Sequence, residues 1–280
     1  MRKGKRLLKT INQNKFFLAL FSIFLSLLLI VGSTYSWITY SDEYVNQSKT
    51  SKRELSAVLE GNFTSELQWK SGEAVENHLA VKNNGQMPAV VRIALYEFLA
   101  HFAVDLTDGS GNGNLKTVKK ASPTNFLPQD LSTWTKNNTY KIASDRYFVV
   151  EEVYKSNKND SSTAYIYEGN RPFESLNYLT IHFNESVIYT DSRKPPAATK
   201  DYWYYKDGYF YYSEILQPKQ KTKQLITSIS LAANLPNKYK GSLYQLTPIM
   251  DAHDITKSLM TDWQIASNSY VETIYREKVH

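Results

Sequence analysis

Cysteine is absent from the 280-residue chain. This absence excludes disulfide bridges, thiolate metal sites and a cysteine nucleophile. A secreted domain of this size does not need disulfides, because an apolar core can supply its stability. The lack of cysteine is therefore compatible with an exported protein.

The chain after residue 36 has no net charge, although the formal net charge of all 280 residues is +6. Six of the 33 Lys and Arg residues precede residue 37, where no Asp or Glu occurs, so 27 basic residues match 27 acidic ones in the remainder. A surface that follows a nucleic-acid backbone needs a basic face. The sequence therefore does not predict nucleic acid as a partner.

Motifs that carry chemistry are also missing. The five histidines include no His-Glu-x-x-His pair, and there is no Gly-x-Ser-x-Gly elbow. Glu151 and Glu152 are adjacent, so on a strand they point to opposite faces. The glycine run 108–114 lacks the Gly-Lys-Ser/Thr ending of a phosphate loop. His253 and Asp254 fit a surface pair at a strand end, and the sequence predicts no catalytic residue, cofactor or metal site.

Residues 1–36 have the layout of an export signal. Basic residues precede the apolar run 16–32, and the small residues Thr34 and Ser36 follow it. This order predicts cleavage between Ser36 and Trp37. The alternative is a retained anchor, because the uncharged stretch is long enough for a tilted transmembrane helix. We expect the segment to be membrane-inserted before cleavage, and the protein to be secreted to the extracellular matrix or cell surface.

Strand patterns dominate the chain after the polar segment 37–54, and no helical period is sustained. Aromatic and β-branched residues, which include 21 tyrosines, favour half-buried strands. The predicted strands are 55–59, 74–82, 89–99, 146–154, 164–167, 177–189, 223–231 and 243–252, and a short helix is expected at 254–263. The sequence predicts an all-β antiparallel sandwich over 55–265, with a loop-rich insertion at about 100–200 and a weakly structured tail at 266–280.

The clearest local structure is a hairpin at 201–216. Asp207-Gly208 is a type I′ turn signal, and a two-residue loop fixes the strand register. One face of the hairpin then carries Trp203, Tyr205, Phe210 and Tyr212. The other face carries Tyr202, Tyr204, Tyr209 and Tyr211. We expect one face to pack in the core and the other to be a possible contact face for a partner, unless its tyrosines only meet water.

Three stretches resemble, in order, the SipW-dependent biofilm matrix proteins of Gram-positive bacteria, the BsaA and TasA-like group. The first is the signal junction GSTYSWITYSD at 32–42. The second is QWKSGE at 68–73 with AVKNNG at 80–85 and AVVRI at 89–93. The third is DGYFYY at 207–212, ILQP at 215–218, LITSI at 225–229 and YQL at 244–246. The family pattern has Gly after this proline, where the chain has Lys219.

The resemblance implies a jelly-roll sandwich, cleavage by a SipW-type signal peptidase and a structural, non-enzymatic role in extracellular fibres. It also implies self-association, in which the freed arm 37–54 of one subunit completes a sheet of the next by strand addition. The expected arm contacts are Trp37, Ile38, Tyr40 and Val45. Other matrix proteins or a polysaccharide are further expected partners.

Two alternatives remain open at the level of the sequence. One is a membrane-anchored surface adhesin or binding module that uses the aromatic face at 202–212. The other is a camelysin-like metalloprotease, which the missing His-Glu-x-x-His motif disfavours.

Overall fold

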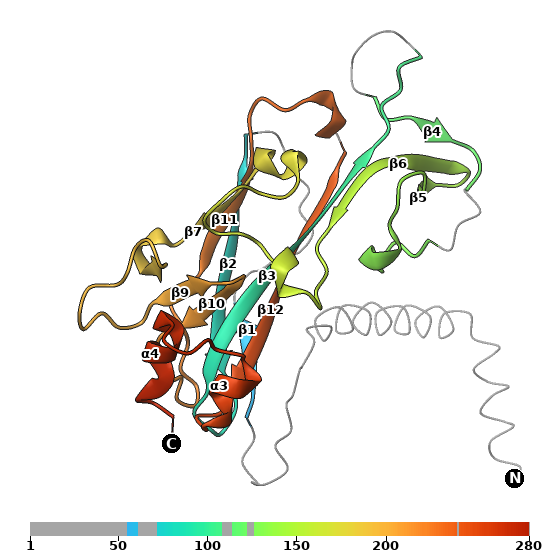
Figure 1. Ribbon diagram of the computed structural model, residues 1–280. Helices are drawn as coiled ribbons and strands as arrows, with labels where there is room; N and C mark the ends of the chain where they lie inside the picture. Colours follow the sequence, from blue (N-terminus) through green and yellow to red (C-terminus); the bar gives the residue numbers. More distant parts are fainter. Residues whose placement is uncertain (1–54, 61–71, 108–113, 122–125, 240, 280) are drawn as a thin grey trace, which may run out of the picture. The chain divides into compact units, whose positions relative to one another are not determined.

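The computed structural model describes residues 55–60, 72–107, 114–121, 126–239 and 241–279, all within the unit Val45–His280 (Figure 1). The predicted cleavage site, Ser36 and Trp37, and the arm residues Ile38, Tyr40 and Val45 lie outside this part. In the described ranges, no helix is long and apolar enough to cross a membrane.

Strands form most of the described secondary structure, and the two α-helices follow the last strand. The strands are β1 (Ala57–Glu60), β2 (Ala74–Asn83), β3 (Val90–Phe102), β4 (Thr117–Val118), β5 (Thr139–Ala143), β6 (Arg146–Lys155), β7 (Leu179–Phe183), β8 (Ile188–Tyr189), β9 (Trp203–Lys206), β10 (Tyr209–Tyr212), β11 (Ile226–Leu231) and β12 (Leu243–His253). The helices are α3 (Ser258–Asp262) and α4 (Tyr270–Arg276), with short 3-10 turns at Leu131–Thr133, Ser161–Thr163, Glu174–Tyr178, Glu185–Val187 and Asn237–Tyr239. The predicted all-β class is confirmed.

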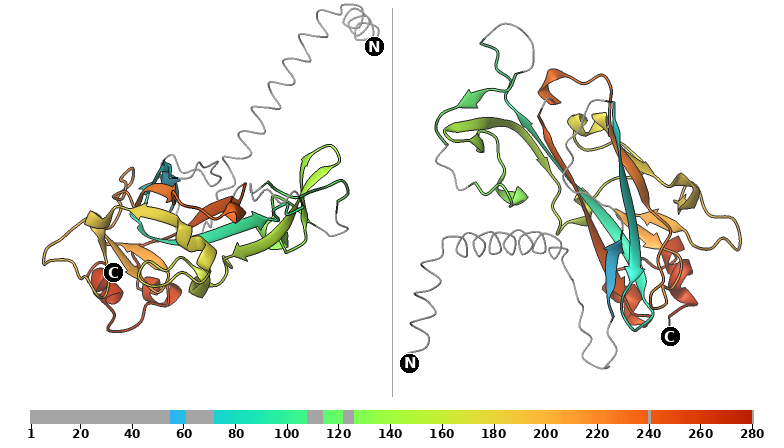
Figure 2. Two further views of the ribbon diagram at one scale, coloured as in Figure 1. Left: turned by 90° about the horizontal axis from the view of Figure 1, so that it is seen from above. Right: turned by 180° about the vertical axis from the view of Figure 1, so that it is seen from behind.

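Two sheets contribute to one main core (Figures 1 and 2). The first sheet has the order β1-β2-β11-β7, and the second has β4-β6-β3-β10-β9-β8, with β12 added to β3 and β5 to β6. The described strand pairs are antiparallel except β8 with β9, which is parallel. Leu79 of β2, Ile181 of β7 and Ile93 of β3 share the core cluster. The described part is therefore sandwich-like, as alternating apolar positions dictate.

Strand β3 organises the second sheet because it has partners along both edges. One edge pairs with β12 from Val90 to Ala100. The other edge pairs first with β10 and then with β6. Every residue of β3 is buried, including Arg92 and Tyr96, which the period-2 pattern assigns to the second, outer face. That face is therefore covered as well.

The predicted loop-rich insertion at about 100–200 also contains the strands β4 to β8, with 3-10 turns and irregular segments between them. Strand β7 is an integral edge of the first sheet, with Leu179 and Phe183 in the main core. Strand β6 extends the second sheet, and its Val150 packs in a separate cluster with Trp134.

The predicted hairpin register is confirmed, with Tyr205 opposite Phe210 and Trp203 opposite Tyr212. Asp207 has φ of 49° and Gly208 has φ of 84°, as a type I′ turn requires. A Cβ atom on Gly208 would lie 2.6 Å from the carbonyl oxygen of Ser161. Only glycine therefore fits this turn without a shift of the neighbouring backbone.

Residues 266–280, predicted to be a weakly structured tail, contain a capped helix. The side chain of Ser269 accepts a hydrogen bond from the N–H of Glu272 at the start of α4. Val271, Ile274 and Tyr275 of α4 are buried against the second sheet. Their i, i+3, i+4 spacing is the apolar stripe of a helix that packs on one side, although the segment is too short to stand out by period alone.

Candidate functional site

The predicted contact face is closed by the chain itself. The exposed fractions are 6% for Tyr202, 0% for Tyr204 and 6% for Tyr211, because α3 and α4 pack on these rings in one apolar cluster. The guanidinium of Arg92 stacks on Tyr209, with its carbon 4.1 Å from the ring centroid. The hypothesis of an exposed aromatic face is therefore corrected: the face is a second core between the sheet and the C-terminal helices.

Among the strands that the structure describes, β12 has the longest edge that no second strand pairs with. It has 11 residues, and its described strand partner is β3 alone. Leu246, Met250 and Ala252 direct their side chains into the main core. A strand added to this edge would extend the sheet beside that core. We take this edge as the candidate functional site.

Pro248 lies in the middle of the β12 edge, opposite Leu95. The carbonyl of Leu95 accepts a hydrogen bond from the N–H of Tyr165 at 2.7 Å, so the backbone of Leu95 faces away from β12. Residues opposite one another in an antiparallel ladder either both face inward or both face outward. Pro248 therefore turns its backbone to the open edge, where its missing N–H interrupts the row of donors without weakening the β3–β12 ladder.

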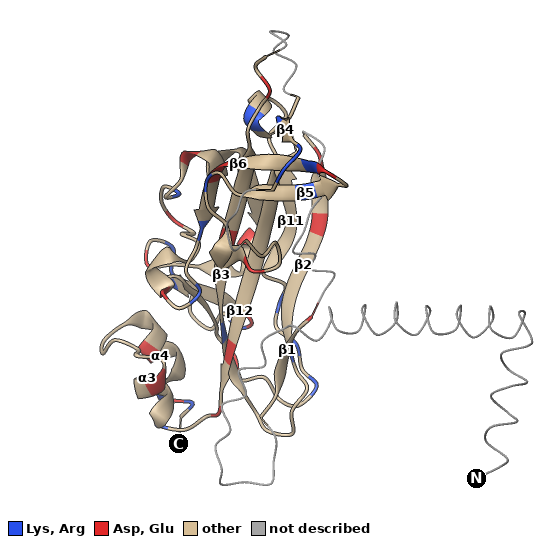
Figure 3. Cartoon of the chain, turned by 90° about the vertical axis from the view of Figure 1, so that its right-hand side faces the viewer, with Lys and Arg blue, Asp and Glu red and all other residues tan. Residues whose placement is uncertain are grey.

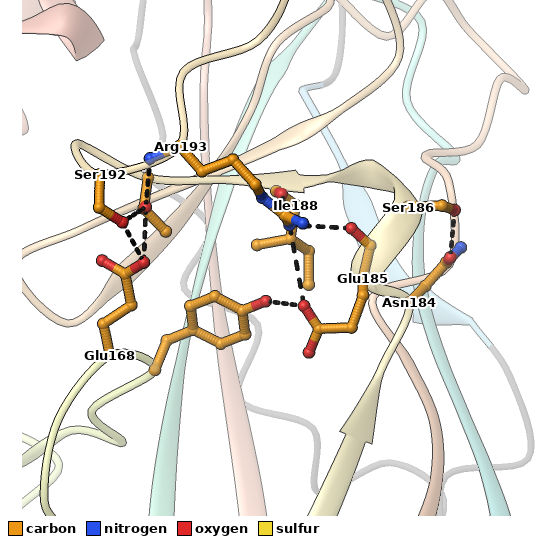
Figure 4. Close-up of polar contacts among 9 residues, drawn as sticks. Glu168, Asn184, Glu185, Ser186, Ile188, Ser192 and Arg193 are labelled. Atoms are coloured by element: carbon orange, nitrogen blue, oxygen red, sulfur yellow. Dashed lines mark hydrogen bonds and ion pairs between the residues drawn. The ribbon is translucent and has the colours of Figure 1, made fainter.

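Two other edges are capped by arginines. Arg171 donates to the carbonyl of Leu179 on β7. Arg193 donates to the carbonyls of Ile188 on β8 and of Glu185, the latter at 2.9 Å (Figure 4). A guanidinium bonded to an edge carbonyl stands where an incoming strand would approach, which hinders strand addition there. These contacts favour β12 over β7 and β8 as an acceptor.

Replacing Pro248 with threonine is expected to increase self-association. Threonine restores an outward N–H, and one added hydrogen bond is worth roughly 0.5–1.5 kcal/mol, or about a two- to tenfold tighter association. Sedimentation velocity measures this change. The matched control is Thr247→Val on the same strand, whose backbone faces β3, and it should leave association unchanged. Equal association of P248T and the parent protein contradicts an accessible edge.

A buried ion pair lies beside β12. Arg171 donates to Glu97, and the hydroxyl of Tyr244 on β12 donates to the same carboxylate oxygen at 2.7 Å. The exposed fractions are 10% for the Arg171 side chain and 3% for that of Glu97. Burial raises the pKa of the Glu97 carboxyl, while Arg171 and Tyr244 oppose the rise. The pair joins the segment before β7 to the second sheet.

His101 is a buried, neutral imidazole. Its Nδ1 lies 2.6 Å from the hydroxyl oxygen of Ser242, and that hydroxyl donates to the carbonyl of Lys238 at 3.1 Å. Burial lowers the pKa of His101 to about 4. The ring lines a cleft of about 680 Å³ with Trp134 and three lysines, Lys136, Lys155 and Lys238.

His253 is buried rather than a surface residue at a strand end. Its Nε2 lies 2.8 Å from a carboxylate oxygen of Asp262, and its Nδ1 lies 2.7 Å from the carbonyl of Asp254. The contact with His253 lowers the pKa of the Asp262 carboxyl. These bonds hold α3 against the end of β12. In the part of the chain that the structure describes, no group of three or more His, Asp or Glu residues is arranged to hold a metal ion.

Lys, Arg, Asp and Glu are interspersed along the described strands, without separation by sign (Figure 3). This distribution agrees with the balance of 27 basic and 27 acidic residues after residue 36.

Comparison with known proteins adds no relative. No protein-family model, curated protein or solved structure matches the chain. The function is therefore argued from the residues and the geometry.

The sequence contained one signal for the open edge and none for the arginine caps. A proline inside a strand pattern indicates an edge or a bulge, and Pro248 lies inside the predicted strand 243–252. Arg171 and Leu179 are close in sequence, but their contact depends on the turn at Glu174–Tyr178. No periodic pattern encodes such a contact.

Proposed function

We propose that the protein is an exported structural subunit of an extracellular fibre, in the biofilm matrix or on the cell surface. The arm 37–54 of one subunit adds as a strand to β12 of the next. The observation that carries this proposal is the edge of β12 that faces away from β3, where no second strand pairs with β12 among the described residues. Main-chain hydrogen bonds supply the affinity in strand addition.

Jelly-roll topology, cleavage between Ser36 and Trp37 and a SipW-type peptidase belong to the same proposal. Cleavage would free the arm, so processing would precede assembly. The arm is longer than the 11 residues of β12, and its apolar residues Ile38 and Tyr40 are two positions apart. They would therefore share one face of an added strand.

Strand addition within one subunit is the competing arrangement. Strand β1 follows the arm closely in sequence and contacts β12, so addition to the subunit's own β12 is the alternative to test. Addition between subunits depends on concentration, whereas addition within a subunit does not.

Deletion of residues 37–46 from protein that starts at Trp37 is expected to abolish fibres and leave soluble monomers. The parent protein should polymerise faster as its concentration rises, because the arm acts on a second subunit. Electron microscopy and light scattering measure both effects.

The matched control keeps the length of the arm. Ile38→Asp with Tyr40→Asp should prevent assembly, because two charges would enter an apolar face, whereas Thr39→Ser should not. Fibres of equal length and number from the parent and the deletion variant would sink the proposal of a donor arm.

The adhesin alternative loses its proposed surface. Of the tyrosines expected to contact a ligand, Tyr202, Tyr204 and Tyr211 are buried in the cluster with α3 and α4, and Tyr209 is partly buried against it. A binding role would need another site on the chain.

A further inference from the structure

Two loops with one sequence pattern flank a second cleft. Residues 127–133 read LPQDLST and residues 157–163 read NKNDSST. In the first loop, Asp130 Oδ1 accepts from the N–H and the hydroxyl of Ser132, at 3.0 and 2.7 Å. In the second, Asp160 Oδ1 accepts from the same groups of Ser162, at 3.0 and 2.6 Å. The two loops are thus built alike.

A threonine closes each loop. The hydroxyl oxygen of Thr133 lies 3.1 Å from the backbone nitrogen and 3.0 Å from the carbonyl oxygen of Leu127. Thr163 makes the same two contacts with Asn157, at 2.8 and 2.9 Å. Each loop is therefore a closed ring of hydrogen bonds, which holds the backbone between the closing residues in place before any ligand arrives.

The cleft between these loops has a volume of about 480 Å³, within the range of small-molecule sites. Its lining is rich in side chains that carry an amide or a hydroxyl: Tyr96, Gln129, Ser132, Ser156, Asn157, Asn159, Gln245 and Thr247. Gln129 and Asn159 are exposed on the loops, and no hydrogen bond within the described ranges uses their amide groups. Free amides both donate and accept, as sugar hydroxyls do.

The strands at the base of the cleft have few free main-chain groups with which a peptide could form hydrogen bonds. Tyr96 and Phe98 of β3 lie opposite Thr247 and Gln245 of β12, and the main-chain groups of these four residues are used in that ladder. Strand addition into the cleft is therefore excluded, and recognition falls to the side chains.

The charged side chains at the cleft do not favour an anionic ligand. Lys155 donates to the carbonyls of Ser132 and Trp134, so its ammonium group holds the first loop in place. Lys158 and Asp130, which carry opposite charges, both line the cleft. We propose that this cleft binds a neutral saccharide chain, with Gln129 and Asn159 bonding its hydroxyl groups. The proposal does not depend on fibre formation. The cleft uses side chains, whereas the donor-arm proposal uses the main-chain groups of β12 on the side away from β3.

Titration calorimetry on the full-length protein in mild detergent tests the proposal. The neutral probes are tetrasaccharides of β-1,4-linked glucose, β-1,3-linked glucose and β-1,4-linked N-acetylglucosamine. An anionic probe alternates glucuronate with N-acetylglucosamine. We expect saturable binding of at least one neutral probe, weakened roughly fivefold by Gln129→Ala and again by Asn159→Ala.

The matched control is Gln217→Ala, which removes an exposed amide outside the cleft and should leave affinity unchanged. Binding of the anionic probe alone, binding that both cleft variants retain in full, or no binding of any neutral probe at millimolar concentration overturns the proposal. Protein that starts at Trp37 and carries both cleft substitutions should still form fibres, so this test and that of the donor arm fail independently.

Discussion

Replacing Arg171 with methionine should lower the free energy of unfolding by about 3–5 kcal/mol at neutral pH, the usual cost of breaking a buried ion pair. The guanidinium donates to Glu97 and to the carbonyls of Leu176 and Leu179. Its loss leaves a carboxylate that is 3% exposed and that still accepts a hydrogen bond from the hydroxyl of Tyr244. Urea unfolding measures the change.

The loss caused by Arg171→Met should shrink as the pH falls from about 8 to about 5. Burial raises the pKa of Glu97 and Arg171 opposes this rise, so removing Arg171 raises the pKa further. The folded variant then binds a proton more readily than the unfolded chain does, and its stability increases as the pH falls. Protonation also removes the buried charge that lacks a partner.

Two variants provide controls for Arg171→Met. Arg276→Met removes a helical i, i+4 partner of Glu272, where the Arg276 side chain is 59% exposed, and should cost about 0.5 kcal/mol or less. Glu97→Leu combined with Arg171→Met should recover part of the lost stability, because no charge remains buried. A loss as small as that of Arg276→Met, or a loss that does not change with pH, contradicts this account.

Replacing Tyr275 with alanine is expected to cost about 3–5 kcal/mol, as for other large aromatic side chains in a core. Tyr275 is 0% exposed and packs in the cluster between α4 and the aromatic hairpin face. Its hydroxyl also donates to the carbonyl of Tyr212 at 2.7 Å. The truncation should loosen α4 and expose the rings beneath it, which urea unfolding and binding of an apolar dye measure.

Graded variants separate the packing of Tyr275 from its hydrogen bond. Tyr275→Phe keeps the ring and should cost roughly 0.5–1.5 kcal/mol. Glu277→Ala alters an exposed residue next to the helix and should leave both stability and dye binding unchanged. If Tyr275→Ala is as stable as Glu277→Ala, α4 does not seal the second core.

Local chemistry explains which structural predictions succeeded. The Asp207-Gly208 turn fixed the register of Trp203 with Tyr212, because a two-residue loop leaves one pairing for its flanking strands. The alternation at Leu179, Ile181 and Phe183 indicated a strand with one buried face, which β7 confirms. Such patterns act over two to four residues, so they can be read without knowledge of the rest of the chain.

Non-local packing explains which predictions failed. The hairpin has aromatic residues on both faces, and alternation alone does not tell which face meets water and which meets α4. The pair Glu97 and Arg171 is separated by 74 positions, so no local pattern joins them. The two loops at the cleft were different: their shared Asp-x-Ser-Thr pattern was present in the sequence, but its meaning required knowing that both loops line one cleft.

The sequence by itself determined the all-β class and the hairpin register. These depend on side-chain alternation and turn geometry, which are properties of a few neighbouring residues. The tertiary structure decided that the tyrosine face is a second core, that β7 belongs to the first sheet and that arginines cap the competing edges. Those outcomes depend on which distant segments bury each other's apolar surface, and this is settled only when the complete domain has folded.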